Sequence, residues 1–477
     1  MTTTRNRLVL PGLLLVAMVT GVIGSLGAPI IPEIAREEDV PLRTAQWSLT
    51  AGLLVSAVAT PVVGRLGAGR RRKPTILVVL GVVAVGTLLA ALPLGIGALI
   101  AGRALQGTGF ALTPLAFAVA RDALPVERQR SAIAAISVAS IVSAGLGFPV
   151  TAVTAELAGL KGAFWLGFVL TLVALGVALL TVPPSAEPVV TRIDWPGAAL
   201  LGAGTFLLLL AISQADHWGY LAPVTVAAVL GGFALLGCCA WWLRRATYPL
   251  VDLSLAAHPG VAGAHVAALV AGCAMYMVFA LVMVLLQTPD GAGFGLGLSV
   301  AVAGSMMVPY AVASVVGNQL ALRFGPAIGA DLLLPFGCLV YAVANLVFLL
   351  APASLGMVLV LMVVSGLGSG LTFNSIPWLM LRFVPAAETG SAMSFNLVMR
   401  FLGFSLGSAL SLAALQGFAD DDGHPTELGY RMGAAWGVAI SLVAALACGL
   451  LARAATRRAR AAVPAAPVAA VGSEFPA

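Results

Sequence analysis

The chain alternates long apolar runs with short polar segments, and most runs are long enough to cross a lipid bilayer. A helix that spans the hydrocarbon core needs about 20 predominantly apolar residues. Glycine and proline occur inside the runs, which spanning helices tolerate when neighbouring helices satisfy the freed backbone groups. The pattern predicts an all-α membrane protein with about 14 transmembrane helices. The runs lie at about 8–31, 45–64, 75–93, 95–120, 131–155, 162–182, 196–213, 221–243, 259–287, 297–321, 331–351, 355–380, 391–416 and 431–452.

Two polar patterns recur about 260 residues apart. Gln106–Gly109 precedes Arg121 in the first half, and Ser365–Gly368 precedes Arg382 in the second. A chance match between glycine-rich helices is the alternative, but we interpret the pattern as a duplication. It predicts two six-helix pseudo-symmetric bundles plus two inserted helices, as in transporters built from parallel repeats. The expected parts are an N-terminal bundle at 1–182, two linker helices with flanking loops at 183–258, a C-terminal bundle at 259–452 and a disordered cytoplasmic tail at 453–477.

Composition and charge agree with a membrane protein. Of the 477 residues, 60% are hydrophobic and 9% are charged, whereas a soluble domain carries about 25% charged residues. Nineteen of the 25 lysines and arginines fall on the side of the N-terminus and four on the other side. Because basic loops stay in the cytoplasm, we expect both termini to be cytoplasmic. The excess of arginine over lysine, with the high alanine and glycine content, indicates a GC-rich bacterium, and we expect the protein in the inner membrane. The net charge of +6 is not a sign of nucleic-acid binding.

Several classes of protein are excluded or disfavoured. The five cysteines and four histidines show no metal-ligand spacing, so neither a metal site nor another cofactor is expected. Neither lysine follows a phosphate-binding glycine loop, which argues against an ATP-driven pump. The scattered histidines also argue against a membrane-embedded enzyme. The expected partners are the lipid bilayer, a small amphiphilic substrate and protons, and we expect a monomer.

Arg103 is the residue that most demands an explanation, because it falls inside a predicted span. An arginine at the middle of a spanning helix costs at least about 2.5 kcal/mol, and such residues usually face a bundle interior or an aqueous cavity. Gln106 lies three residues on and shares its helix face. We therefore predict a polar pathway beside Arg103 and Gln106. The alternative is that Arg103 bonds backbone carbonyls and only holds helices together.

The loop between the second and third spans contains Gly64, Leu66, Arg72 and Lys73, and in these residues it resembles the signature loop of the major facilitator superfamily. Four of its residues fit that pattern, while Ala68 stands where the family has an acidic residue that helps to hold a cytoplasmic gate. The resemblance implies a gating role for the loop, and a basic loop that only sets topology is the alternative.

Further motifs resemble the fourteen-span drug:proton antiporter branch of this superfamily. Arg103, Gln106, Gly107 and Gly109 fit the fourth-span motif, whose arginine is linked to proton coupling in the branch. The fifth span carries a degenerate copy of the antiporter motif, and a kinked packing helix is its alternative. The linker region and the thirteenth span also fit the branch. The degenerate motif consists of Gly145, Gly147 and Pro149.

One departure concerns proton coupling. The branch usually has an aspartate in the first span, but no acidic residue occurs from Leu8 to Ile31. A carboxylate in a partly dry site beside an arginine is a suitable proton carrier. We therefore hypothesise that Glu33 or Glu156, each at a span end, exchanges a proton against Arg103. Simple solvation of both glutamates is the alternative.

A substrate cavity is expected between the halves, near the membrane midplane. Methionine is adaptable and suits surfaces that bind varied apolar molecules, although packing is the alternative role for such a cluster. Without a buried acid, neutral or anionic amphiphiles fit better than cationic drugs. The candidate cavity residues are Met275, Tyr276, Phe279, Met283, Met307, Tyr310, Asn374, Asn396 and Arg400.

Together these observations favour a secondary active exporter of a drug, antibiotic or metabolite. It would work by alternating access coupled to proton influx. A proton-independent facilitator, or a lipid or metabolite transporter of the same fold, is the nearest alternative. A membrane sensor that transports nothing is the alternative from a different class.

Overall fold

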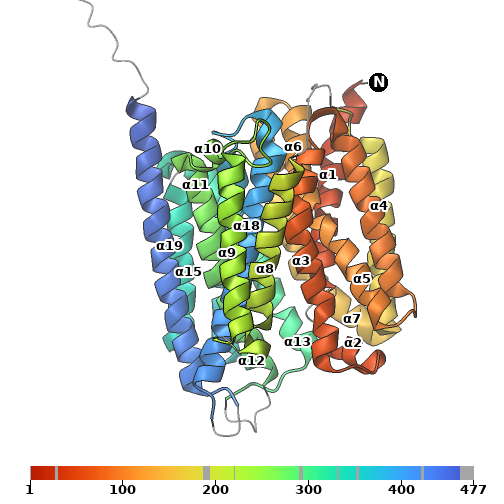
Figure 1. The fold of residues 1–477 in the computed structure, drawn as a ribbon, viewed down its shortest axis with the longest axis vertical. Coiled ribbons are helices and arrows are strands. Elements are labelled where there is room, and N and C mark those ends of the chain that lie inside the picture. Colours follow the sequence, from red (N-terminus) through yellow and green to blue (C-terminus); the bar gives the residue numbers. More distant parts are fainter. Residues whose placement is uncertain are drawn as a thin grey trace, which may run out of the picture.

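The computed structural model describes residues 2–26, 31–185, 194–219, 221–288, 294–329, 332–350, 354–420 and 424–461. These residues are almost entirely helical (Figure 1). The first half contains α1 (Thr2–Ser25), α2 (Ile31–Glu37), α3 (Leu42–Leu66), η2 (Gly69–Arg71), α4 (Arg72–Ala91), α5 (Ile96–Gly107), η3 (Thr108–Ala111), α6 (Leu112–Ala123) and α7 (Val126–Thr181). The helices α8 (Trp195–Trp218) and α9 (Pro223–Leu243) follow.

The second half continues with α10 (Leu253–Ala256), α11 (Pro259–Val266), η4 (Ala267–Ala271), α12 (Gly272–Gln287), α13 (Val300–Ser305), α14 (Met307–Ile328) and α15 (Leu333–Leu350). It ends with α16 (Leu355–Thr372), α17 (Ile376–Met380), η7 (Ala386–Glu388), α18 (Thr389–Gly417) and α19 (Glu427–Ala461).

The described helices agree with the predicted number of spans. Thirteen of them are long and apolar enough to cross a membrane. The further predicted span, 95–120, is present as α5 and α6, but η3 divides it into pieces too short to qualify alone. Within α7, Gly159 has φ 74° and separates two spans that the helix assignment joins. The prediction of an all-α membrane protein with about 14 spans is confirmed.

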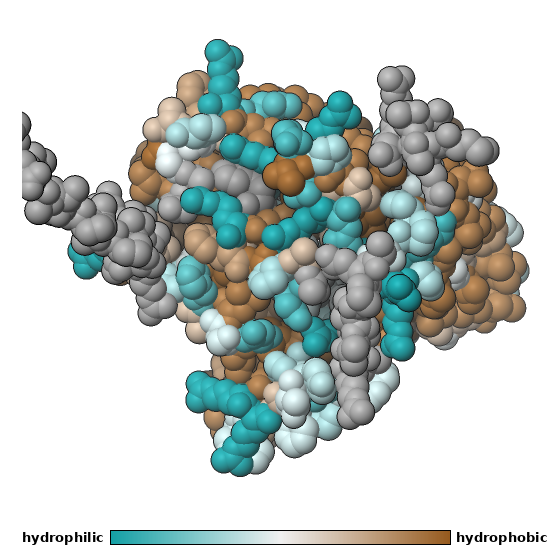
Figure 2. All heavy atoms as spheres, turned by 90° about the horizontal axis from the view of Figure 1, so that it is seen from above, coloured by the Kyte–Doolittle hydropathy of each residue, from teal (hydrophilic) through white to brown (hydrophobic). Residues whose placement is uncertain are grey.

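Both ends of the described chain lie at the same end of the molecule (Figure 1). We call this the proximal end, and the end that contains α2 and α13 the distal end. Hydrophilic side chains are spread over the proximal face (Figure 2). Many large apolar side chains are exposed, among them Val85, Val173 and Leu446 on membrane-spanning helices, as a protein surrounded by lipid requires.

Glycine contacts support the internal repeat. A side chain at Gly107 on α5 would collide with the backbone of Gly52 on α3. In the second half, a side chain at Gly366 on α16 would collide with the carbonyl of Tyr310 on α14. These two close approaches join equivalent pairs of helices and lie about 259 residues apart. Small residues at both sites allow the helix backbones to touch.

The inserted helices lie across the two halves on one side of the molecule. Leu208 and Leu209 of α8 pack against Leu54 of α3 and Leu402 of α18. Asp194 fixes the start of this unit, because its carboxylate accepts hydrogen bonds from Gly197 N and Trp242 Nε1, each at 2.8 Å, and from Leu250 N at 3.3 Å. The exact domain limits 182, 258 and 452 stay predictions.

The segment after α9 ends in a second capped helix. Asp252 caps α10 by accepting hydrogen bonds from the hydroxyl and backbone of Ser254 and from Leu255 N. The hydrogen bond from the Ser254 hydroxyl, with those from the two backbone amides, holds the pKa of Asp252 below its usual value. This cap orients the chain as it enters α11 and the second half.

Candidate functional site

Arg103 is sealed inside the first half. Its residue is 3% exposed, and its Nη1 donates to Gln106 Oε1 at 2.6 Å and to the carbonyl of Ile23 at 3.2 Å. Its neighbours on α5, Gly102 and Gly107, touch the backbones of α4 and α3. Neither Arg103 nor Gln106 lines one of the described pockets. In this conformation Arg103 therefore joins α5 to α1, which matches the alternative role considered above.

Neither of the two proposed proton carriers, Glu33 and Glu156, forms a described hydrogen bond with Arg103. Glu33 forms an ion pair with Arg36 on the same short helix. Glu156 is exposed on α7. The described hydrogen bonds of Arg103 go to an amide and a carbonyl, and not to either carboxylate.

Other acidic residues of the distal end hold the fold of the first half. Glu37 Oε1 accepts from Leu160 N at 3.0 Å, just after the break at Gly159, and Glu38 pairs with Lys161 at 2.6 Å. These contacts fasten α2 to the turn between two spans.

Most of the predicted methionine and aromatic cavity residues form a packed cluster in the second half. Tyr310 donates its hydroxyl to Met275 Sδ at 3.3 Å, and its ring meets Phe279 edge-on at 4.7 Å. The ring of Tyr276 stacks on Phe404 at 5.3 Å. Met275, Met307 and Tyr310 belong to the main hydrophobic core, with Phe279 and Met283 packed against it. These contacts match the packing alternative.

The remaining three predicted residues, Asn374, Asn396 and Arg400, line a small polar space between the two halves, which we call the central cavity. Its volume is about 50 Å³, room for a few water molecules and not for a drug-sized ligand. The lining residues are Thr113, Pro114, Phe117, Ser137, Ser140, Ile141, Phe373, Asn374, Pro377, Met393, Asn396, Leu397 and Arg400. They come from α6 and α7 on one side and from the α16–α18 region on the other.

The wall contributed by the first half is made of hydroxyl groups. Thr113 Oγ1 donates to Thr20 Oγ1 at 3.2 Å and lies 3.5 Å from Ser140 Oγ. Thr20 in turn donates to the carbonyl of Gly109. This chain of hydroxyls presents a neutral hydrogen-bonding surface that can rearrange by rotation of its O–H groups.

The wall contributed by the second half contains strong polar groups that are poorly satisfied. Asn374 is 0% exposed, and neither atom of its amide has a hydrogen-bond partner among the described residues. The same holds for Arg400 Nε and Asn396 Oδ1. Each buried polar group without a partner costs about 1–3 kcal/mol. Such groups are kept where water or a ligand satisfies them in the working protein.

An aromatic ring lies beside the guanidinium of Arg400. Its Cζ lies 4.6 Å from the centroid of the Phe373 ring, within cation–π range. The next residue, Phe401, meets Phe110 of the first half edge-on at 5.1 Å. The two halves thus touch beside Arg400, and the central cavity stays small.

An ion pair joins the halves at the proximal end, and we call it the proximal latch. Arg65 Nη1 donates to Glu388 Oε1 at 2.7 Å and to Oε2 at 2.8 Å, across 323 positions of sequence. The side chains are 9% and 28% exposed. Beside the pair, a side chain at Gly64 would collide with Ser394 and the carbonyl of Gly390 on α18. Glycine at position 64 lets α3 approach α18 closely enough for the pair to form.

The other predicted gating residues hold the loop within the first half. Arg72 is 2% exposed, pairs with Asp122 and donates to the carbonyls of Gly67 and Ala118 at 3.2 Å. Lys73 donates to the carbonyl of Leu179 at 2.8 Å. Leu66 is half-buried at the end of α3. Position 68 carries no carboxylate, and the acidic partners near this loop are Asp122 for Arg72 and, across the interface, Glu388 for Arg65.

A second inter-half contact comes from Arg121 at the end of α6. Its Nη1 donates to the carbonyl of Val384 at 2.6 Å and to Thr389 Oγ1 at 2.9 Å, and its Nη2 donates to the carbonyl of Leu381 at 3.3 Å. Arg121 therefore holds the segment between α17 and α18 against the first half.

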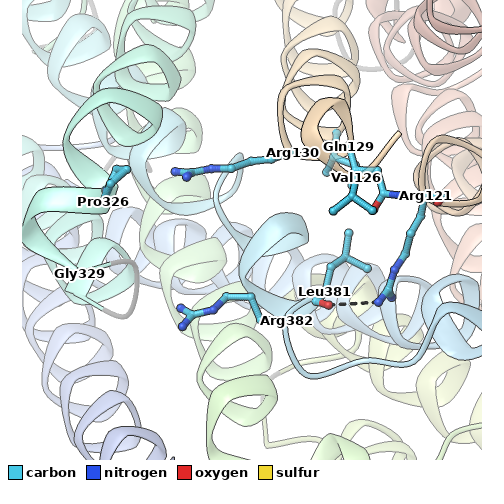
Figure 3. Close-up of a pocket in the computed structure, with 10 residues that line it drawn as sticks. Arg121, Val126, Gln129, Arg130, Pro326, Gly329, Leu381 and Arg382 are labelled. Carbon is cyan, nitrogen blue, oxygen red and sulfur yellow. Dashed lines mark hydrogen bonds between the residues drawn. The ribbon is translucent and has the colours of Figure 1, made fainter. Parts of the chain in front are cut away.

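A pocket of about 570 Å³ lies beside these contacts, and we call it the arginine pocket (Figure 3). Arg121, Arg130 and Arg382 line it together with Val126, Gln129, Ile133, Gly325, Pro326, Gly329 and Leu381. These residues come from the proximal ends of α6, α7 and α14 and from the turn after α17. At the proximal end, the two halves are thus joined by the latch at one place and leave the arginine pocket open at another.

The degenerate antiporter motif packs in two directions. A side chain at Gly145 would lie 2.5 Å from Ala311 Cβ on α14, in the other half. A side chain at Gly147 would collide with Ser25 on α1, in the same half. Pro149 lies within α7 one turn further. The motif therefore lets α7 approach both a helix of its own half and one of the other half.

Some site residues gave no clear signal in the sequence. Thr113, Ser137 and Ser140 resemble ordinary hydroxyl residues of a membrane helix, and Arg65 and Glu388 lie far apart in the chain. The repeated arrangement of Arg121 and Arg382 was the one available hint for the arginine pocket. Among the described residues, no group of three or more histidine, cysteine or acidic side chains has the arrangement of a metal site.

Comparison with known proteins identifies relatives along most of the chain. The profile of the Major Facilitator Superfamily matches residues 13–408. The chain is 25% identical to the uncharacterised MFS-type transporter YvkA of Bacillus subtilis, over 83% of this chain and 88% of that one. It is 28% identical to the cephamycin export protein CmcT of Amycolatopsis lactamdurans, over 87% and 86%. Other curated relatives are longer, and the chain spans 39% and 60% of two of them.

A solved structure shows the same fold. The proton:xylose symporter XylE superposes with a TM-score of 0.64 and 14% sequence identity, over 93% of this chain and 95% of that one. At this identity the likeness concerns the arrangement of the helices alone.

Proposed function

Because the chain belongs to the major facilitator superfamily, a family of membrane transporters, we propose that it is a secondary exporter of small amphiphilic molecules that works by alternating access. The proximal end is cytoplasmic, as the distribution of basic residues favours, and the membrane is the inner membrane of a bacterium. The protein acts as a monomer, with the two halves moving relative to each other.

The observation that carries this proposal is the central cavity between the halves. It holds polar groups that lack partners among the described residues, at the interface where a moving transporter binds its cargo. The halves are joined at the proximal end by the latch and by Arg121, through contacts that must separate for cargo to enter from the cytoplasm. A volume of about 50 Å³ fits a closed stage of such a cycle.

Export, as opposed to uptake, is supported by a relative. CmcT is named as a cephamycin export protein and aligns with this chain over most of both lengths. An antibiotic, another drug or a metabolite is therefore the proposed class of cargo. Several such compounds, or a single one, would fit this proposal.

Proton influx is the proposed driving force, since the motifs of the fourth span and the linker resemble the drug:proton antiporter branch. A proton-independent facilitator is the second candidate, and a specific observation favours it. Within the spans that the structure describes, the acidic residues lie at or near helix ends, and none lines the central cavity.

The test is transport by the purified protein in liposomes, with candidate antibiotics and an imposed pH gradient. When the pH gradient is imposed, an exporter moves at least one compound against the concentration gradient of that compound. Transport that is unchanged after the pH gradient collapses identifies the facilitator. A membrane sensor would move none of the compounds, although it would still bind them.

A further inference from the structure

The two spaces at the interface between the halves share one sign of charge. The arginine pocket is lined by Arg121, Arg130 and Arg382, and the central cavity by Arg400. Among the described lining residues of both spaces, none is acidic. Asp331, two positions after Gly329 in the sequence, lies outside the described residues. Spaces with one sign of charge and apolar walls concentrate ligands of the opposite charge.

The two spaces are also stacked along the same elements. On α6, Arg121 lines the arginine pocket and Phe117 lines the central cavity. The same spacing of four residues relates Ile133 to Ser137 on α7. A rise of 1.5 Å per residue makes this offset about 6 Å, one helical turn.

A third element, α17 with the turn after it, shows the same relation. Leu381 lines the arginine pocket and Pro377 lines the central cavity. Three separate segments thus place the arginine pocket directly proximal to the central cavity. Parting of the halves at this point would open one space into the other.

The polar groups of the central cavity specify more than charge. The Arg400 guanidinium and the Asn374 amide nitrogen can only donate hydrogen bonds. The side-chain oxygens of Asn374 and Asn396 can only accept them, and both lack partners among the described residues. A ligand that satisfies all of them carries an anionic acceptor and at least one donor. The Phe373 ring beside Arg400 adds an apolar face for the rest of the molecule.

We propose that the cargo is an anionic amphiphile with a hydrogen-bond donor, whose acidic group pairs with Arg400 and whose donor bonds Asn374, and that it enters through the arginine pocket. This rests on the proposed function, since it names the cargo of that site. A cationic drug would instead meet the positive charge of Arg400 in the central cavity, where no described lining residue is acidic.

The test is an equilibrium binding assay with two dyes built on the same ring system. The assay is run at mildly acidic pH, where carboxyfluorescein is anionic through its carboxylates and keeps a protonated phenol as donor, while tetramethylrhodamine methyl ester is a cation. Fluorescence anisotropy of each dye is measured with the full chain in detergent micelles. We expect carboxyfluorescein to bind at least about tenfold more tightly, a difference of one charge-assisted hydrogen bond.

Variants identify the residues that bind the dye. Arg400→Gln is expected to weaken carboxyfluorescein binding by about tenfold without weakening the cationic dye, and Asn374→Leu by about threefold to tenfold. The matched control is Arg323→Gln, which removes an exposed arginine on α14 that lines neither space. Thermal unfolding verifies that each variant is folded. If Arg400→Gln does not fold, Asn374→Leu tests the proposal in its place.

The outcomes separate this inference from the proposed function. Three outcomes would each overturn the anionic cargo. The folded wild type could prefer the cationic dye, it could fail to bind carboxyfluorescein, or folded Arg400→Gln could bind carboxyfluorescein as tightly as the wild type does. If the liposomes transport the cationic dye and not the anion, the exporter stands and the cargo class is wrong. If Arg400-dependent binding occurs but no compound is transported in liposomes, the binding site stands and the exporter is wrong.

Discussion

Two arginines lie within the membrane-spanning part of this protein, and their surroundings differ. Arg103 is inside the first half, bonded to Gln106 and to the carbonyl of Ile23. Arg400 lies at the interface between the halves, over the face of Phe373 and beside an amide with no partner among the described residues. In both arginines Nε has no hydrogen-bond partner among the described residues. The hydrogen bonds of Arg103 lie within its own half, whereas Arg400 is placed where the two halves would separate.

The comparison shows what a charge inside the membrane does and does not indicate. The cost of burying an arginine explains why it must have polar neighbours. It does not tell whether those neighbours are part of the fold or part of the cargo. In a transporter built from two repeats, the interface between the repeats is what moves. From their positions relative to that interface, we propose a transport role for Arg400 and a structural role for Arg103.

The largest expected effect is on transport by Arg400→Gln. Loss of one charge-assisted contact to an anionic cargo corresponds to a decrease of about tenfold to a hundredfold in transport at low substrate concentration. Thermal unfolding should change by only a few degrees, because the described contact of this side chain is the one with the Phe373 ring. The measurement is initial efflux rate from liposomes, with Arg323→Gln as control. Normal transport by folded Arg400→Gln would remove the contrast between the two arginines.

Gln106 provides the next test, and here the expected effect is on stability. Gln106→Leu leaves Arg103 without its side-chain acceptor, which should destabilise the protein by about 1.5–3 kcal/mol. The double variant Arg103→Met with Gln106→Leu replaces both partners by apolar groups, a change that can be nearly neutral. We therefore expect the double variant to be more stable than Gln106→Leu alone. The measurement is thermal unfolding of the three proteins in detergent.

Transport by the double variant decides between the two roles of Arg103. If the arginine only joins α5 to α1, the double variant transports at a rate near that of the wild type. If it lies on a polar pathway, as the sequence alone suggested, transport is lost even though the protein is stable. The second result would place both arginines on the route of cargo or protons.

The sequence predicted the helices well, because length and apolarity are local properties. It did not predict the break at Thr108–Ala111, which divides one span into α5 and α6. It also could not rank Arg103 against Arg400, since both read as a single arginine in an apolar run. Packing decides which face of a helix contacts the other half, and the sequence does not show it. Arg65 and Glu388, for example, are 323 residues apart, and no local sequence pattern predicts their ion pair.

The proximal latch gives a smaller, conformational prediction. Glu388→Gln removes the charge but keeps the size of the side chain, and the loss of a partly buried ion pair is worth about 1–2 kcal/mol. The proximal side should then open about fivefold to thirtyfold more often. The measurement is the labelling rate of a cysteine placed at Ser137, on the central cavity, by a reagent added from the proximal side.

Exchange of the two charges is the control for the latch. Arg65→Glu combined with Glu388→Arg restores an ion pair at the same place, so the labelling rate should return toward that of the wild type. The native cysteines are replaced first in all of these proteins. Equal labelling in Glu388→Gln and the wild type would show that the pair does not hold the halves together.

The smallest effect is expected from the two glutamates proposed as proton carriers from the sequence. Glu33 is paired with Arg36, and Glu156 is exposed, so their carboxylates have a partner or solvent away from the interface of the halves. If the interface of the halves is where transport occurs, Glu33→Gln with Glu156→Gln should alter pH-driven efflux by less than about twofold. The measurement is efflux over a range of imposed pH gradients. A loss of proton dependence, with downhill transport retained, would instead support proton coupling by these glutamates and Arg103.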